Sequence, residues 1–129
     1  MATSTLLNDN LKTELIWTNP SPTTGIADSS KTIAMGTTKQ FRMVAISFYQ
    51  NTNAVYLEQY VFTRGYSNNT RLITSVRWDG NAGTICGKTA TYNFSTNELT
   101  ITKGYAQSTY GTWVADSTVL IPYQVIGIY

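Results

Sequence analysis

The chain has 129 residues, of which 42% are hydrophobic and 12% charged, and its net charge is +2. This composition excludes an intrinsically disordered chain, and the scattered Lys and Arg residues exclude the basic stripe of a nucleic-acid-binding protein. No apolar stretch approaches the ~20 residues that span a membrane, and the amino-terminal segment lacks the pattern of a signal peptide. Cys86, the single cysteine, cannot form an intrachain disulfide, and we expect it to be a small buried side chain.

Short runs of β-branched and aromatic residues occupy most of the chain after a polar, aperiodic arm, residues 1–12. We interpret residues 13–129 as a single domain because turn signals recur every ~8–12 residues throughout it. Pro20 and Pro22 remove two backbone donors, so the first run must end before them. The predicted strands are 13–17, 31–35, 41–49, 54–64, 71–78, 84–87, 89–94, 99–104 and 117–129, the last interrupted at Pro122, with a loop at 107–113.

No window of helical length shows a period of about 3.6 residues, so the pattern predicts an all-β antiparallel β-sandwich of jelly-roll type. An immunoglobulin-like sandwich or a small barrel is the alternative, although one cysteine cannot supply the immunoglobulin disulfide. On strand 71–78 we expect Leu72 and Val76 to face inward, and Ile73 and Ser75 to lie on the other face. The side chains predicted to be mostly buried are Trp17, Val44, Ile46, Leu72, Val76, Leu99, Ile101 and Ile126.

The chain contains no histidine, which removes the commonest general base and the commonest metal ligand. The seven acidic residues are dispersed, although a distant pair such as Glu58 and Asp116 could still meet in the fold. The segment DGNAG, residues 79–83, lacks the later ligands of a calcium loop and predicts a turn. We therefore expect no enzymatic activity, no cofactor and no metal site.

Two segments, FTRGYSNNT (62–70) and ITKGYAQST (101–109), share a strand end followed by a basic residue, Gly, Tyr and small polar residues. One interpretation is that glycine turns the chain and tyrosine folds back over the sheet. The other is that the loops present aromatic faces and amides to a sugar ring, which suits a surface rich in uncharged polar side chains. The candidate ligand-binding residues are Tyr66, Asn68, Tyr105, Tyr110 and Trp113.

Three segments carry a resemblance to a known family: ELIWTNPSPTTGIA (14–27), FRMVAISFY (41–49) and VLIPYQVIGIY (119–129). Together they resemble a small β module of tailed bacteriophages, found at the tips or C-terminal domains of tail, baseplate and receptor-binding proteins. The matching residues are Trp17, Thr18, Asn19, Pro20 and Pro22 at the opening and Ile121, Pro122, Ile126, Gly127 and Ile128 at the ending. Residues 25–28 depart from the usual Phe-Ala-Ala-Gln, and Tyr129 stands where a basic residue is common.

The resemblance implies a non-enzymatic structural protein of the virion, at a tail or fibre tip or in a receptor-binding module that contacts a host surface glycan or protein. A capsid decoration or assembly protein, whose arm 1–12 contacts virion neighbours, is one alternative, and a cellular carbohydrate-binding domain is the other. Apolar residues occupy both alternate sets of 41–49 and 119–129, which predicts an exposed patch and self-association. The preference for a trimer over a dimer comes from the resemblance. We expect no nucleic-acid partner and no membrane insertion.

Overall fold

The computed structural model describes residues 12–65, 69–78, 83–107 and 111–129, with the backbone only for residues 77 and 78. These residues form ten antiparallel strands and no helix, which confirms the predicted all-β sandwich. The strands are β1 (Thr13–Thr18), β2 (Ser30–Ala34), β3 (Met43–Asn51), β4 (Leu57–Thr63), β5 (Thr70–Trp78), β6 (Gly83–Asn93), β7 (Glu98–Thr102), β8 (Tyr105–Gln107), β9 (Trp113–Ala115) and β10 (Val119–Ile128).

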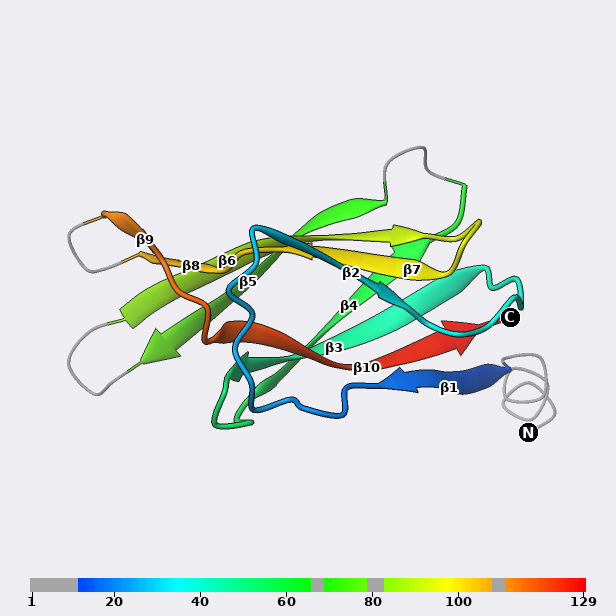
Figure 1. Cartoon of the computed structure of the whole chain (residues 1–129), viewed down its shortest axis with the longest axis horizontal. Coiled ribbons are helices and arrows are strands. Elements are labelled where there is room, and N and C mark those ends of the chain that lie inside the picture. The colour runs from blue at the N-terminus through cyan, green and yellow to red at the C-terminus, as the bar shows by residue number, and fades with distance from the viewer. Residues whose placement is uncertain (1–11, 66–68, 79–82, 108–110) are drawn as a thin grey trace, which may run out of the picture.

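The strands form two sheets that pack face to face (Figure 1). One sheet has the order β1-β10-β3-β4, and the other has the order β2-β7-β6-β8-β9 with β5 paired to β6. The chain crosses between the sheets after β1, β2, β4 and β9, as it does in sandwiches with Greek-key connections. The start of β1 pairs with the end of β10, and the β8–β9 hairpin lies at the opposite end of the long axis (Figure 1).

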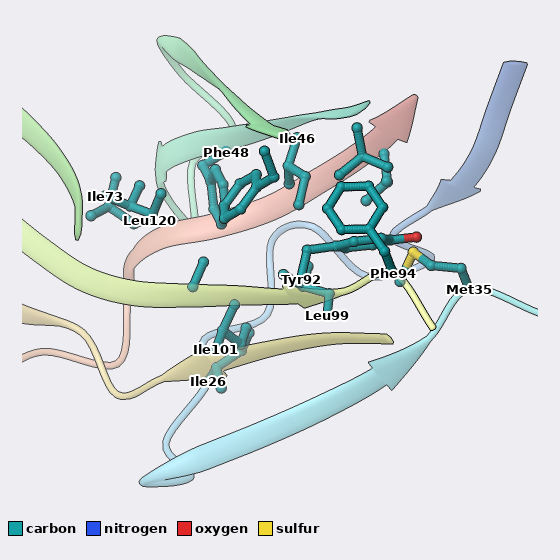
Figure 2. Packing of buried hydrophobic residues seen from close by; sticks show 14 of the residues in the cluster. Ile26, Met35, Ile46, Phe48, Ile73, Tyr92, Phe94, Leu99, Ile101 and Leu120 are labelled. Atoms are coloured by element: carbon teal, nitrogen blue, oxygen red, sulfur yellow. The ribbon is translucent and has the colours of Figure 1, made fainter. Parts of the chain in front are cut away.

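The core lies between the two sheets and contains side chains from both (Figure 2). Four of the side chains predicted to be buried are fully so: Val44, Ile46, Leu99 and Ile101. Trp17 and Ile126 are only half-buried, because β1 is an edge strand and the outer face of β10 is partly open. Cys86 is buried in the core, as expected.

The face predicted for β5 is wrong. Leu72 and Val76 are each 65% exposed, whereas Ile73 and Ser75 lie inside the sandwich. The interior accepts Ser75 because buried Gln50 satisfies it: Gln50 Nε2 donates to Ser75 Oγ at 2.7 Å and to the carbonyl oxygen of Val76 at 2.8 Å. Burying a polar group costs little free energy when its hydrogen bonds are made within the protein. β5 can therefore place its serine inward and two large apolar side chains outward.

Two predicted strand boundaries also differ from the structure. The predicted strand 54–64 begins only at Leu57, because Ala54 and Tyr56 adopt φ values of 56° and 54° and form a turn instead. The predicted strands 84–87 and 89–94 are one strand, β6, which continues through Lys88. Residues 79–82 of the predicted turn 79–83 lie outside the described residues, and Gly83 begins β6. Residues 108–110 of the predicted loop 107–113 also lie outside them, whereas Gln107 and Trp113 at its ends belong to β8 and β9, two short strands that the sequence did not predict.

β10 is continuous through Pro122, where we had expected an interruption. Pairing with β1 stops at Gln124, so Pro122 lies where β10 has a neighbour only on its β3 side. Leu120 has a φ of 54°, and the register shifts between Pro122 and Gln124. These irregularities bend β10, so that Val119 and its three successors are all buried.

The exposed patch expected on β3 and β10 is therefore absent from these two strands. None of their side chains is exposed, and Tyr49 and Tyr123 pack against each other with ring centroids 4.7 Å apart. Exposed apolar side chains gather instead on β5, β6, β8 and β9: Leu72, Val76, Ile85, Tyr105, Trp113 and Val114. Self-association stays a prediction, and the exposed apolar side chains that could support it lie mainly on the other sheet, with Leu15 on β1 and Leu57 and Val61 on β4 besides.

Candidate functional site

Two of the five candidate ligand-binding residues lie close together on the outer face of the larger sheet. Tyr105 begins β8 and is 43% exposed, and Trp113 begins β9 and is 50% exposed. Tyr66, Asn68 and Tyr110 lie outside the described residues. The sequence named Tyr105 and Trp113 from their loop context alone, and the structure adds the strands that surround them.

The strand register brings β5, β6, β8 and β9 together under these aromatic rings. Gly87 of β6 pairs with Thr74 of β5 on one side and with Tyr105 of β8 on the other. Two pairs further along β8, Gln107 faces Trp113 of β9. Since side chains alternate between the two faces of a strand, these residues share the outer face with Leu72.

A groove of about 340 Å³ lies over Gly87. A Cβ atom on Gly87 would lie 3.9 Å from Leu72 Cδ1 and 4.0 Å from Trp113 Cζ3, so these two side chains border the space above the glycine. Any larger residue at position 87 would fill that space. The lining residues are Leu72, Thr74, Gly87, Lys88, Thr89, Thr102, Lys103, Tyr105 and Trp113. The surface inside the groove is therefore almost wholly apolar, so polar contacts to a ligand must come from its edge.

Some polar groups of the lining residues already form hydrogen bonds within the protein, and others are available to a ligand. Thr89 and Thr102 satisfy each other, since their hydroxyls lie 2.9 Å apart and Thr102 Oγ1 also accepts the Thr89 N–H. The backbone N–H and carbonyl of Thr74 bind the hydroxyl of Tyr60 behind the sheet edge. The Tyr105 hydroxyl and the Trp113 indole N–H bind no described residue, so both can serve a ligand.

Positive charge lies beneath and beside the groove, because the Lys88 side chain points to the inner face of β6, under the floor, and Lys103 is a lining residue. Lys88 is only 3% exposed, and its Nζ finds no hydrogen-bond partner in the described part of the chain. Burial lowers the pKa of Lys88 from 10.5 to about 8, because desolvation penalises the ammonium form. Lys103 is half-buried at the rim. No described lining residue is acidic, so neither charge is compensated within the groove.

The residues that the sequence missed are Leu72 on β5, Gly87 and Lys88 on β6, and Lys103, which directly follows β7. For Lys88 a signal was present. Alternation along β6 places it with Cys86 and Ala90 on the inner face, but only if residues 83–93 are one strand. The position of Gly87 between Leu72 and Trp113 depends on strand pairing, which no local pattern reports.

A second groove, of about 390 Å³, lies beside the proline-rich loop and is lined in part by Trp17, Asn19 and Lys31. The side-chain amide of Asn19 already forms hydrogen bonds within the protein through both its nitrogen and its oxygen. Asn19 Nδ2 donates to the carbonyl oxygen of Pro122 at 2.8 Å, and its Oδ1 accepts the N–H of Ser21 at 2.8 Å. These bonds hold the loop against β10, so we assign this region a structural role.

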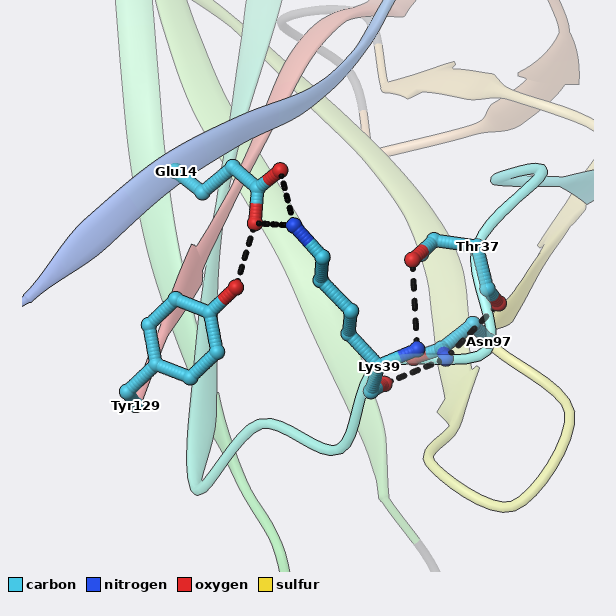
Figure 3. Close-up of polar contacts among 5 residues, drawn as sticks. All are labelled: Glu14, Thr37, Lys39, Asn97 and Tyr129. Atoms are coloured by element: carbon cyan, nitrogen blue, oxygen red, sulfur yellow. Dashed lines mark hydrogen bonds and ion pairs between the residues drawn. The ribbon is translucent and has the colours of Figure 1, made fainter.

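Glu14, Lys39 and Tyr129 form a polar cluster that also holds the chain ends in place (Figure 3). Lys39 Nζ donates to Glu14 at 2.8 Å, and the Tyr129 hydroxyl donates to the same carboxylate. The hydrogen bond from Lys39 and then that from Tyr129 lower the pKa of Glu14, and the same contact raises that of Lys39. The cluster is exposed and internally paired, so it joins β1, the 35–42 loop and the end of β10 rather than binding a substrate.

Within the described ranges, no three His, Cys, Asp or Glu residues gather as a metal site would require. Glu58 accepts a hydrogen bond from Ser75 at 3.2 Å, and Asp116 accepts one from the Thr118 N–H at 2.9 Å. The described part of the chain contains no helix that is long and apolar enough to cross a membrane.

Comparison with protein-family models, with curated proteins and with solved structures finds no match for this chain. The function is therefore inferred mainly from the residues that line the groove over Gly87.

Proposed function

We propose that this chain is a non-enzymatic binding module whose groove over Gly87 takes a saccharide ring, and that it does so as a structural protein of a tailed-phage virion. The observation that supports the binding half most directly is the placement of Leu72 and Trp113 on either side of a residue without a side chain. A sugar ring has apolar C–H faces and a rim of hydroxyls. It therefore suits an aromatic wall flanked by hydrogen-bonding groups.

The groove meets the requirements of such a ligand in size and chemistry. Its volume of about 340 Å³ lies at the lower end of the range for small-molecule sites. Trp113 borders the groove with its ring, and Tyr105, whose hydroxyl has no described partner, is a lining residue. The strands beneath are paired throughout, so the groove is formed before the ligand arrives and little ordering entropy opposes binding.

The virion half of the proposal is supported by the resemblance of the opening and ending segments to a phage module. In the structure these two segments form one unit, since Trp17 pairs with Val125 and Asn19 binds the carbonyl of Pro122. They lie on the sheet opposite the groove, so the resemblance bears on the fold and its setting and not on the ligand.

A second candidate function, virion assembly or capsid decoration, is favoured by the apolar surface beyond the groove. Val76 of β5 and Ile85 of β6 pair with each other, and both are exposed. Neither lines the groove, and together they extend its apolar wall along the sheet. Exposed apolar area of this kind usually marks a protein contact. Val76→Lys should then prevent incorporation into particles without changing saccharide binding.

The test of the binding half is a glycan array followed by calorimetry with the saccharides that bind. Trp113→Ala should weaken binding at least about tenfold, since aromatic contacts of this kind contribute about 1–3 kcal/mol. Tyr56→Ala is the matched control, because Tyr56 is an exposed tyrosine in the β3–β4 turn, which contributes nothing to the groove. Absence of binding to any saccharide, or an equal loss in both variants, would remove the proposal.

The virion half is tested by gene order and by labelling. Neighbouring genes for capsid and tail proteins, and antibody labelling at a tail or fibre tip, are the expected results. Labelling over the head would favour decoration, and neighbouring polysaccharide-degrading enzymes would favour a cellular carbohydrate-binding domain instead.

A further inference from the structure

The charge of the groove carries an inference about the class of saccharide. Two of its lining residues, Lys88 and Lys103, are cationic, and the described lining contains no carboxylate. Elsewhere in the described chain, several cationic side chains have partners of their own: Lys39 binds Glu14, and Arg64 and Arg71 donate to backbone carbonyls. The two lysines of the groove have none.

Lys88 supplies a charge beneath the floor. Its neighbours along β6, Gly87 and Thr89, line the groove with it, and its buried ammonium has no hydrogen-bond acceptor among the described residues. With a pKa of about 8 the amine is mostly protonated at pH 7. A positive charge in such a low-dielectric setting acts over a longer range than one in water, because less solvent screens it.

Lys103 supplies a charge that a ligand can touch. It follows β7 directly, where its backbone N–H donates to the carbonyl oxygen of Ser29 at 3.2 Å. The side chain is half-buried at the groove rim, close in sequence to Tyr105. The backbone of Lys103 is thus held in position, while its ammonium binds no described residue.

We propose that the groove selects an anionic saccharide, with a sugar ring between Leu72 and Trp113 over Gly87 and its negative group bound by Lys103. This inference rests on the proposed saccharide-binding function. The anion can be the carboxylate of a uronic or sialic acid or the phosphate of a polyol-phosphate chain, since each accepts hydrogen bonds from an ammonium group. A neutral saccharide would leave the charge of Lys103 uncompensated.

The test compares matched probes by calorimetry: oligogalacturonate with its carboxyl-reduced counterpart, sialyllactose with lactose, and a glycerol-phosphate oligomer. The wild-type chain should bind at least one anionic probe about tenfold more tightly than its neutral partner, as expected for a charge-assisted hydrogen bond. Which probe binds identifies the source of the anion. Added salt should weaken the anionic probe selectively.

Variants separate the inference from the function on which it rests. Lys103→Met should bring the ratio of anionic to neutral affinity close to one and leave neutral binding unchanged, whereas Trp113→Ala should weaken both. Lys31→Met, an exposed lysine on β2, is the matched control and should change neither. Circular dichroism and melting curves establish that each variant is folded.

Equal affinity of the wild-type chain for anionic and neutral probes would overturn the charge inference and leave saccharide binding intact. A preference that survives in Lys103→Met would also overturn it. No binding of any probe by the folded wild-type chain would overturn both.

Discussion

Replacing Lys88 by Met should stabilise the protein at neutral pH. Methionine keeps the length and most of the apolar volume of lysine but carries no charge to desolvate. Burial lowers the pKa of Lys88 from 10.5 to about 8. At about 1.4 kcal/mol per pH unit, that difference corresponds to about 3 kcal/mol of folding free energy that wild type loses at pH 7. The variant should recover up to this amount.

The pH dependence gives the same prediction an independent readout. Below about pH 8 the amine is protonated in both the folded and the unfolded state, so wild type bears the full cost. Between about pH 8 and 10.5 the unfolded state binds more protons than the folded state, so the stability of wild type rises with pH. Lys88→Met should lack this rise. Urea unfolding followed by tryptophan fluorescence from pH 7 to about pH 9.5 measures both quantities, below most tyrosine ionisation.

Lys31→Met is the control for the loss of one surface charge, and it should change the free energy of unfolding by less than about 0.5 kcal/mol at every pH. Should Lys88→Met be no more stable than wild type at pH 7, with parallel pH curves, the ammonium of Lys88 is not a buried, uncompensated charge. The groove would then lose one of its two positive charges.

Three further outcomes test the core, the ending segment and the oligomeric state. Ile46→Ala should cost ~2–5 kcal/mol in denaturant melts and Ile46→Val only ~0.5–1.5 kcal/mol, because a fully buried side chain leaves a cavity; a loss below 1 kcal/mol for alanine would contradict its burial. Gly127→Ala should cost ~1–3 kcal/mol, since its Cβ would meet buried Phe41, with Cζ at 2.7 Å, and Phe41→Leu in the same chain should restore part of that loss. Sedimentation at micromolar concentration should give about 43 kDa for a trimer, three times the 14.3 kDa of one chain, and a clean monomer would contradict self-association.

The sequence predicted the inner face well where one alternate set of residues is more apolar than the other. Val44 and Ile46 on β3 and Leu99 and Ile101 on β7 are buried as expected, because in each strand the more apolar set faces the core. Pro20 and Pro22 marked the end of β1 for an equally local reason, the missing backbone donors.

The prediction failed where a local pattern competes with a long-range partner. Counting apolar residues placed Leu72 and Val76 inside, but the inner face is decided by Gln50, which lies on another strand and satisfies Ser75. No window around β5 contains that information.

The candidate site was anticipated only in part for the same reason. Tyr105 and Trp113 were named as exposed aromatic residues. The space between Trp113 and Leu72 exists because Gly87 lies between Thr74 of β5 and Tyr105 of β8. That position follows from the register of strand pairing, which the local sequence does not show.

The pairing of β1 with the end of β10 has a consequence for how copies of this domain could be displayed. Both strands reach the same end of the molecule, and the β8–β9 hairpin with Trp113 lies at the other (Figure 1). An attachment beside the start of β1 or the end of β10 would therefore leave the β8–β9 hairpin, which borders the groove, at the end far from the support. Many copies fixed to one surface would present their grooves in parallel, so that a polymeric saccharide with repeated units could engage several at once. Each individual contact can then be weak while the array binds tightly, because every contact after the first is made at a high effective concentration.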